Sequence, residues 1–264
     1  MIIACLVKPV PDPEYYNRIT IDQERGTLNR AGIPVIMNPS DRHALEEAIR
    51  IKEREGGRVT VFSMAPDDTE GILRECIAMG ADNAVLLSDR AFAGADTLAT
   101  SYVLAKALES FGPFDLVLAG NESADGSTSQ VPSQVGVWLS LPALTGVVRI
   151  ERGEGMTAWC DSEGGRVVYE VELPAVLAVK REINEPRYTS FAGIMRAKKA
   201  EIRVIRAGDM ELDAERIGLR GSPTRAVRTV VLDLCRKGEY VEGSTEEAVE
   251  RVIDELRKAG AVKE

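Results

Sequence analysis

The sequence is short of the residues that most enzymes use for acid–base and nucleophilic chemistry. Its 264 residues include one histidine and four cysteines. Because His43 is the single histidine, mechanisms that need two imidazoles are excluded. Its place at a helix start predicts a solvent-exposed position. Cys5, Cys76, Cys160 and Cys235 lack the C-x-x-C spacing of zinc and redox sites. We therefore expect no metal site, no disulfide framework and no catalytic residues of the chain's own.

The sequence also lacks long apolar runs and a positive charge balance. No segment reaches transmembrane length. The first seven residues form a strand-length apolar run that is followed by Lys8, which is unlike a signal peptide. A net charge of −9 argues against binding to nucleic acid. We expect a globular cytoplasmic protein without membrane insertion.

Apolar runs of strand length alternate with amphipathic runs of helix length over the first 140 residues. The pattern predicts right-handed βαβ units and a parallel sheet, an α/β fold. Asn38 is expected at the N-cap and Pro39 at the first helical position of the first helix. The expected strands are 2–7, 58–64, 84–87 and 114–119, and the expected helices are 39–55, 67–79, 97–110 and one from about 133.

The alternation of strand-length and helix-length runs ends after Pro142. Residues 147–150, 156–160, 166–173 and 176–180 are consistent with antiparallel strands that extend the sheet. From Glu182 onward the chain is basic and poor in apolar clusters, which indicates that this part packs on another subunit. An amphipathic helix is expected over 244–258, capped by Ser244 or Thr245. We therefore divide the chain into an α/β domain, 1–182, and an extended C-terminal arm, 183–264.

One loop has the composition of a phosphate-binding site. Residues 120–132 follow an apolar strand, precede a helix, and contain Gly120, Gly126 and the hydroxyls of residues 127–129. Glycines allow close approach of the backbone to a ligand, and a helix start favours an anion. The loop matches neither the P-loop nor the G-x-G-x-x-G pattern. From these residues alone, an ordinary capped strand-to-helix loop remains open.

Several motifs in order resemble the β subunit of electron transfer flavoproteins, including the bifurcating branch related to FixA. The matching residues are 7–12 (VKPVPD), 37–41 (MNPSD), 44–48 (ALEEA), 79–82 (MGAD), 88–100 (SDRAFAGADTLAT), 125–128 (DGST), 130–132 (QVP), 184–188 (NEPRY) and 194–199 (IMRAKK). Each motif is weak by itself, but the ordered set is specific. The resemblance implies a Rossmann-like sheet of the adenine nucleotide alpha hydrolase type.

The resemblance also implies an adenine nucleotide, which is AMP in simple members of the family and a second FAD in bifurcating members. Hydroxyls equivalent to those of Thr97 and Thr100 lie beside the flavin in the bifurcating type; helix capping and a solvated face are their alternative. The implied cofactor-binding residues are Leu6, Asn38, Pro39, Ser40, Asp41, Met64, Thr97, Thr100, Gly120, Asn121, Glu122, Ser123, Ala124, Asp125, Gly126, Ser127, Thr128, Ser129, Gln130 and Val131.

The sequence departs from the resemblance at three positions. Asn121 and Glu122 stand where the bifurcating pattern more often has Arg and Gln, and Glu122 places a carboxylate where a cation would steady a reduced flavin or a phosphate. Pro13 stands where some simple members have an aromatic residue facing the partner's flavin. These departures concern the bifurcating function rather than nucleotide binding.

The implied partners are an electron transfer flavoprotein α subunit that holds the main FAD, and the dehydrogenases and acceptors that exchange electrons with it. The donors are acyl-CoA or other flavin dehydrogenases, and the acceptors are a quinone oxidoreductase or a ferredoxin-type protein. Residues 187–194 resemble the recognition loop that docks on dehydrogenases, with Phe191 at its apolar tip. The alternative places Phe191 against the local core. The basic tract 198–206 and the arm are expected to wrap the α subunit.

The favoured function is an electron carrier subunit whose chemistry belongs to the flavin. The alternative is a stand-alone adenine-nucleotide sensor of the universal-stress type, against which the long basic second half argues. A third class, the adenylate-forming synthetases, requires a pyrophosphate loop of the Ser-Gly-Gly type after the first strand. Residues 8–12 (KPVPD) occupy that place and exclude it.

Overall fold

A computed structural model describes residues 1–18, 20–22, 27–29, 32–153, 155–224, 238 and 240–262. Residues 1–229 form one compact unit and residues 230–264 form a second. The first unit contains the sheet and the helices that cover it, and the second contains α6 (Thr245–Lys258). Cys235 lies outside the described residues. Within the described ranges, no helix combines the length and the apolar character needed to span a bilayer.

Within the described residues, the central sheet has nine strands in the order β11-β10-β9-β12-β8-β1-β6-β7-β13. The six strands from β12 to β13 run parallel, and β9 also pairs parallel with β12. The strands are β1 (Ile2–Leu6), β6 (Arg58–Met64), β7 (Asn83–Leu87), β8 (Leu116–Gly120), β9 (Ala143–Arg152), β10 (Met156–Ser162), β11 (Gly165–Val171), β12 (Ala175–Val179) and β13 (Ile202–Ile205). The parallel sheet with added antiparallel strands confirms the predicted fold class.

The order of the strands reverses next to β1. From β1 the chain passes through α1 (Pro39–Glu55) to β6 on one side, whereas β8 pairs on the other side, with Cys5 opposite Leu118. Ligands of doubly wound sheets bind at such a reversal, outside the carboxyl ends of the strands. The fold therefore directs attention to the crevice beyond Leu6 and Gly120.

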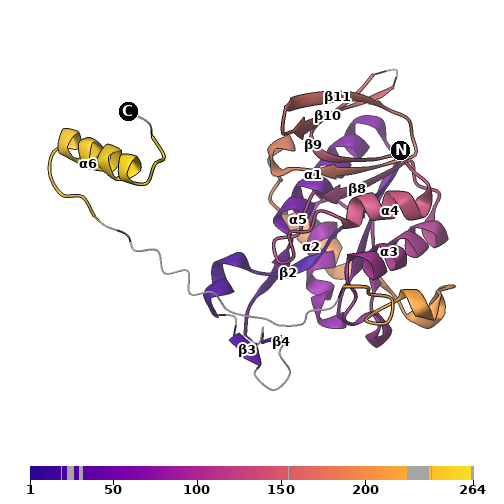
Figure 1. Ribbon diagram of the computed structural model, residues 1–264. Coiled ribbons are helices and arrows are strands. Elements are labelled where there is room, and N and C mark those ends of the chain that lie inside the picture. The colour runs from indigo at the N-terminus through magenta and orange to yellow at the C-terminus, as the bar shows by residue number, and fades with distance from the viewer. Residues whose placement is uncertain are drawn as a thin grey trace. The chain divides into compact units, whose positions relative to one another are not determined.

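Helices cover both faces of the sheet. Helix α1, α2 (Glu70–Met79) and α5 (Phe191–Lys199) pack on one face through Leu45, Leu73 and Ala197. Helix α3 (Thr97–Phe111) and α4 (Val131–Leu139) lie next to each other on the opposite face, where Leu104 and Val135 are buried (Figure 1). The buried side chains on both faces match the apolar positions of the sequence pattern.

Most predicted elements are present with similar bounds. Helix α1 and strand β6 have the predicted bounds, and Gly80 ends α2 with a φ of 146°. A short 3-10 helix, Asp67–Thr69, precedes α2 where one continuous helix was expected. Cys5 and Cys76 are free thiols buried in the apolar core.

Strand β12 runs in the direction opposite to the expected one. The sequence suggested an antiparallel strand at 176–180, but β12 lies between β8 and β9 and is parallel to both. Leu177 pairs with Leu118 on one side and with Leu144 on the other. A continuously apolar five-residue run is typical of a strand buried within a parallel sheet. Strand β10 is antiparallel to both of its neighbours, β9 and β11, as predicted.

Residues 191–205 pack on the α/β domain of the same chain. Helix α5 contacts α2, and β13 adds to the sheet edge beside β7. Arg74 Nη1 donates to the carbonyls of Ala197 and Ala200 at 2.7 and 3.1 Å. The basic tract therefore packs on its own chain through α5 and β13, where the edge strand β7 satisfies the backbone of a segment with few apolar residues. The packing of the rest of 183–264 on a partner stays a prediction.

Two short strand pairs and helix α6 lie outside the central sheet. Strand β2 (Pro9–Pro11) pairs with β5 (Val35–Met37), and β3 (Thr20–Asp22) pairs with β4 (Thr27–Asn29). Helix α6 begins with the predicted cap: Ser244 Oγ accepts from Glu247 N at 3.2 Å, and Ser244 N donates to Glu247 Oε2 at 2.8 Å. This reciprocal capping box satisfies two backbone donors of the first turn.

Candidate functional site

Asp41 joins the ends of the two strands where the sheet order reverses. It lies in the first turn of α1, and its carboxylate accepts from Lys8 N at 2.7 Å and from Gly120 N at 3.1 Å. Lys8 follows β1 and Gly120 ends β8. One carboxylate therefore satisfies backbone donors from both sides of the crevice and sets its width.

The position of Asp41 is costly for a charge. The side chain is only 6% exposed. Burial raises the pKa of Asp41 to about 7, although hydrogen bonds from Lys8 N, the Asn38 side chain and Gly120 N act in the opposite direction. Near neutral pH this carboxyl group therefore changes its protonation state in the folded protein.

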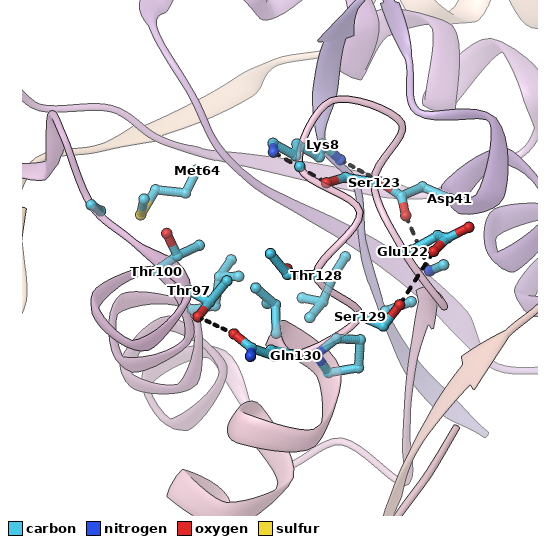
Figure 2. Close-up of a pocket in the computed structure, with 18 of the residues that line it drawn as sticks. Lys8, Asp41, Met64, Thr97, Thr100, Glu122, Ser123, Thr128, Ser129 and Gln130 are labelled. Atoms are coloured by element: carbon cyan, nitrogen blue, oxygen red, sulfur yellow. Dashed lines mark hydrogen bonds between the residues drawn. The ribbon is translucent and has the colours of Figure 1, made fainter. Parts of the chain in front are cut away.

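A cavity of about 390 Å³ opens beyond this crevice, within the size range of small-molecule sites. Figure 2 shows Met64, Thr97 and Thr100 on one side of it and Asp41, Glu122 and Ser123 on the other. The structure thus brings together residues from β1, α1, β6, α3 and the 120–131 loop. The predicted residues that line the cavity are Leu6, Asp41, Met64, Thr97, Thr100, Gly120, Asn121, Glu122, Ser123, Gly126, Thr128, Ser129, Gln130 and Val131.

Six predicted residues do not line the cavity: Asn38, Pro39, Ser40, Ala124, Asp125 and Ser127. Asn38 occupies the N-cap of α1, as predicted, but its side chain makes no cap hydrogen bond. Its amide donates to Glu122 O at 2.9 Å and accepts from Ala124 N at 3.0 Å. Asn38 therefore holds the loop in place. Whether any of the twenty residues touches a nucleotide stays a prediction.

The backbone of the loop is unusual at two serines. Ser127 and Ser129 have φ values of 46° and 54°, in the left-handed region that few non-glycine residues adopt. When left-handed and right-handed backbone conformations alternate along a loop, successive N–H groups point toward a common centre. Such a concave group of N–H donors can bind an anion. Such strained positions in ordered loops are typical of functional sites.

The two glycines of the loop differ in whether a larger residue would fit in their place. A Cβ at Gly120 would overlap with Asp41 Oδ1 and lie 2.7 Å from Asp41 N, so the backbone of Gly120 closely approaches α1. A Cβ at Gly126 would meet Ser123 Oγ only at 3.5 Å, an ordinary contact, and its φ is not left-handed. Gly126 therefore needs neither a left-handed backbone conformation nor extra clearance from neighbouring residues of the chain. The strain lies at Ser127 and Ser129 instead.

Two helices begin at the cavity without a side-chain cap. Neither Asn38 at α1 nor Gln130 at α4 caps its helix, whereas Asp96 caps α3. An uncapped first turn keeps N–H donors and the positive end of the helix dipole for a ligand. Gln130 Oε1 instead accepts from Thr97 Oγ1 at 2.8 Å, which ties the start of α3 to the loop.

The structure adds residues that the sequence analysis did not assign to the site. Phe62, Phe92 and Leu104 form an apolar wall near Met64, and Lys8 lies at the polar side. Asn121 lines the cavity, but its side-chain carbonyl accepts from Gly146 N in β9 at 2.8 Å. The signal for Lys8 was its place directly after the central strand.

The described part of the chain contains no cluster of three His, Cys, Asp or Glu residues that could hold a metal ion. The cavity combines a polar loop with hydroxyls, two helix starts and an apolar wall. This arrangement suits an anionic ligand that also has an apolar, planar part.

A second surface lies at the start of α5. Phe191 is 81% exposed and Tyr188 is 95% exposed, so Phe191 is not folded onto the local core. Phe191 is the first residue of α5, and Ser190 Oγ caps this helix by accepting from Gly193 N at 3.0 Å. The sequence suggested one exposed aromatic residue at a loop tip; the structure shows two, held by a helix start.

An ion-pair network holds the segment before this surface against α1. Arg187 donates to Glu46 through Nε at 2.8 Å and to Glu53 through Nη1 at 2.6 Å. Burial alone would raise the pKa of Glu46, but hydrogen bonds from Arg187 and Arg50 outweigh it and keep this pKa below its usual range. Tyr188 and Phe191 therefore project from a fixed backbone.

Asn184 holds the same segment by a second set of contacts. Its amide donates to Glu47 Oε2 and to the carbonyl of His43, both at 3.0 Å. His43 Nδ1 lies 2.9 Å from Asn184 O. His43 is therefore partly buried and hydrogen-bonded rather than solvated as expected, because residues 141 positions later return to cover it.

Comparisons with known proteins agree with the geometry. A family model described as "Electron transfer flavoprotein domain" matches residues 25–210. The electron transfer flavoprotein subunit beta of Thermoanaerobacterium thermosaccharolyticum is 45% identical over 258 residues, 97% of this chain and 98% of that protein. The caffeyl-CoA reductase-Etf complex subunit CarD of Acetobacterium woodii is 43% identical, over 92% of each chain. Protein FixA of Azorhizobium caulinodans is 38% identical, over 97% of this chain and 94% of that protein.

Proposed function

This chain belongs to the electron transfer flavoprotein family, in the β-subunit role, and from that premise we propose that its cavity binds an adenine nucleotide. The observation that carries the proposal is the crevice between β1 and β8, where Asp41 joins both strand ends and the 120–131 loop begins. Nucleotides of doubly wound sheets lie at this topological position.

The polar side of the cavity supports a place for phosphate groups. Two uncapped helix starts offer backbone N–H donors there, and Ser129, which lies in the left-handed region, borders the cavity. Ser123, Thr128 and Ser129 add hydroxyls. These groups bind and orient a phosphate and neutralise part of its charge, although the chain has no P-loop.

The apolar side supports FAD rather than AMP as the occupant. Beyond the loop the cavity continues along Phe62, Met64, Phe92 and Leu104, and the hydroxyls of Thr97 and Thr100 border it. An apolar wall with a few hydroxyl groups excludes water from a flat ring and hydrogen-bonds its edge. When bound, a flavin supplies one- and two-electron redox chemistry, and the protein's residues bind, orient and shield it.

The nucleotide itself tests the proposal. The full-length chain, purified with its partner subunit, is denatured in acid, and the released nucleotides are identified by visible absorbance and by mass. We expect FAD in excess of one per heterodimer, because the α subunit holds the first. AMP together with a single FAD leaves nucleotide binding intact and assigns the simple type. The absence of any adenine nucleotide from this chain, together with no measurable affinity for AMP or FAD, overturns the proposal.

We further propose that the exposed surface around Phe191 docks on acyl-CoA or other flavin dehydrogenases, while an α subunit binds elsewhere on the chain and passes electrons on to a quinone oxidoreductase or ferredoxin-type acceptor. Tyr188 and Phe191 are large, exposed and rigidly supported by Arg187, which are the properties of an interface anchor. The relative from Acetobacterium woodii is named as part of a complex with a caffeyl-CoA reductase.

Phe191→Ala is expected to weaken docking without affecting the fold. Phe191 is 81% exposed, so its truncation removes little packing within the chain. Loss of an interface aromatic costs on the order of 2 kcal/mol, about thirtyfold in affinity. The apparent KM of an acyl-CoA dehydrogenase for the carrier should rise by about this factor, with an unchanged melting temperature.

Val137→Ala is the matched control, since Val137 is 78% exposed on α4, on the opposite face of the sheet from α5. It should leave the KM near the wild-type value. A Phe191→Ala protein with unaltered kinetics and a lower melting temperature would show that the residue stabilises the fold instead.

A further inference from the structure

We propose that Lys8 supplies the positive charge that binds the nucleotide's phosphate, from the side of the cavity opposite α4. This inference rests on the proposed nucleotide binding and adds a residue to it. Neither the resemblance to the family nor the loop motif assigns a role to Lys8. Its chemistry calls for an anionic ligand, a phosphate monoester or diphosphate.

The backbone of Lys8 is held at both of its polar groups. Its N–H donates to Asp41 Oδ2 at 2.7 Å, and its carbonyl accepts from Asn38 N at 2.9 Å. Both contacts come from the start of α1, one of the two uncapped helix starts at the cavity. The Cα of Lys8 is therefore fixed at the mouth of the crevice, and the side chain determines where the charge lies.

The side chain reaches across to the loop. Lys8 Nζ lies 2.7 Å from Asp125 Oδ1 and 3.3 Å from Ser123 Oγ, as Figure 2 shows for the contact with Ser123. A lysine ammonium group carries three N–H donors, so these two contacts use two of them. The third donor remains for a ligand oxygen while the loop stays attached.

The charges of the cavity make a cation necessary for an anionic ligand. Among the described residues that line it, Lys8 is positive and Asp41, Asp96 and Glu122 are negative, so their formal sum is one minus three, or −2. Asp41 accepts from two backbone N–H groups, and Asp96 caps α3 through Leu98 N and Ala99 N. Because these hydrogen bonds hold the strand ends and the start of α3, the two carboxylates stay in place when a ligand enters. A phosphate entering this field needs the ammonium group of Lys8 in addition to the backbone donors.

Two ligands distinguish a role of Lys8 in phosphate binding from a role in holding the loop. AMP and adenosine share the base and the ribose and differ in the phosphate. Both are titrated calorimetrically into the full-length chain from which bound nucleotide has been removed. A hydrogen bond to a charged group corresponds to about tenfold or more in affinity. Lys8→Met should therefore weaken AMP binding at least about tenfold and leave adenosine binding within about twofold. Lys8→Arg keeps the charge and should retain most of the AMP affinity.

Lys106→Met is the matched control, because Lys106 is a lysine of α3 that pairs with Glu109 and does not line the cavity. It should leave AMP binding within about twofold of the wild-type affinity. Equal losses for AMP and adenosine in Lys8→Met would mean that Lys8 only holds the loop, and unchanged AMP binding would mean that it has no role; either result overturns the inference. Wild-type protein that binds neither AMP nor FAD would refute nucleotide binding itself. The melting temperature of each variant is measured alongside.

Discussion

Replacing Gly120 by alanine is expected to abolish nucleotide retention and to destabilise the α/β unit. The added Cβ would overlap with Asp41 Oδ1 and lie 2.7 Å from Asp41 N, so either β8 or the start of α1 must move. Overpacking of a buried site costs about 3 kcal/mol. That cost corresponds to a melting temperature lower by roughly 6–12 °C in a unit of this size. The movement also breaks the Gly120 N to Asp41 contact that sets the width of the crevice.

Gly126→Ala is the matched control in the same loop. Its added Cβ would meet Ser123 Oγ at 3.5 Å, and no left-handed φ opposes it. We expect a change in stability within about 0.5 kcal/mol and nearly wild-type nucleotide content. Both variants are purified alongside wild type, and nucleotide per chain and melting temperature are measured. A Gly120→Ala protein with normal nucleotide content would contradict the assignment of the crevice.

The free energy of unfolding should depend on pH through Asp41. Burial raises the pKa of Asp41 in the folded protein to about 7, whereas the unfolded chain has an ordinary aspartate. Between about pH 4 and pH 7 the unfolded state releases this proton and the folded state keeps it, so the contribution of Asp41 to stability falls as the pH rises. Three pKa units correspond to at most about 4 kcal/mol.

Asp41→Asn removes the titrating group and isolates this contribution. Urea unfolding of both proteins from pH 4 to pH 8 should show wild type losing stability relative to the variant, with no further change above about pH 7. Glu46→Gln provides a control of opposite sign, because hydrogen bonds from Arg187 and Arg50 hold the pKa of Glu46 low and its stabilisation is lost as the pH falls. A constant difference between wild type and Asp41→Asn across this range would show that Asp41 does not titrate there.

Elements with strong local signals were predictable from the sequence. Helix α1 runs over Pro39–Glu55 because a proline suits its first position, a regular apolar stripe continues to Ile51, and Gly56 ends it with a φ of 73°. The cap of α6 at Ser244 follows from a serine three residues before a glutamate. These signals act between residues a few positions apart, so no knowledge of the rest of the chain is needed.

The direction of individual strands was not predictable from the sequence, nor was the place of weakly apolar segments in the fold. The five apolar residues of β12 indicate a buried strand, but only its pairing with β8 and β9 sets its direction. Residues 202–205 are partly exposed and looked unsuited to a core, yet β13 extends the sheet beside β7. A strand needs few apolar side chains when a neighbouring strand satisfies its backbone.

By itself, the sequence determined that a buried strand leads into a glycine- and hydroxyl-rich loop at residues 120–131 and that the ordered motifs are those of an electron carrier subunit. Only the tertiary structure decided how the site is assembled. Asp41 meets Lys8 across 33 positions and Gly120 across 79, and Lys8 meets Asp125 across 117. Such contacts depend on the order of the strands, because β8 lies beside β1 only after the chain has crossed to the other side of the sheet. Local patterns carry no information about that crossing, so the cation, the buried acid and the loop are joined by the fold alone.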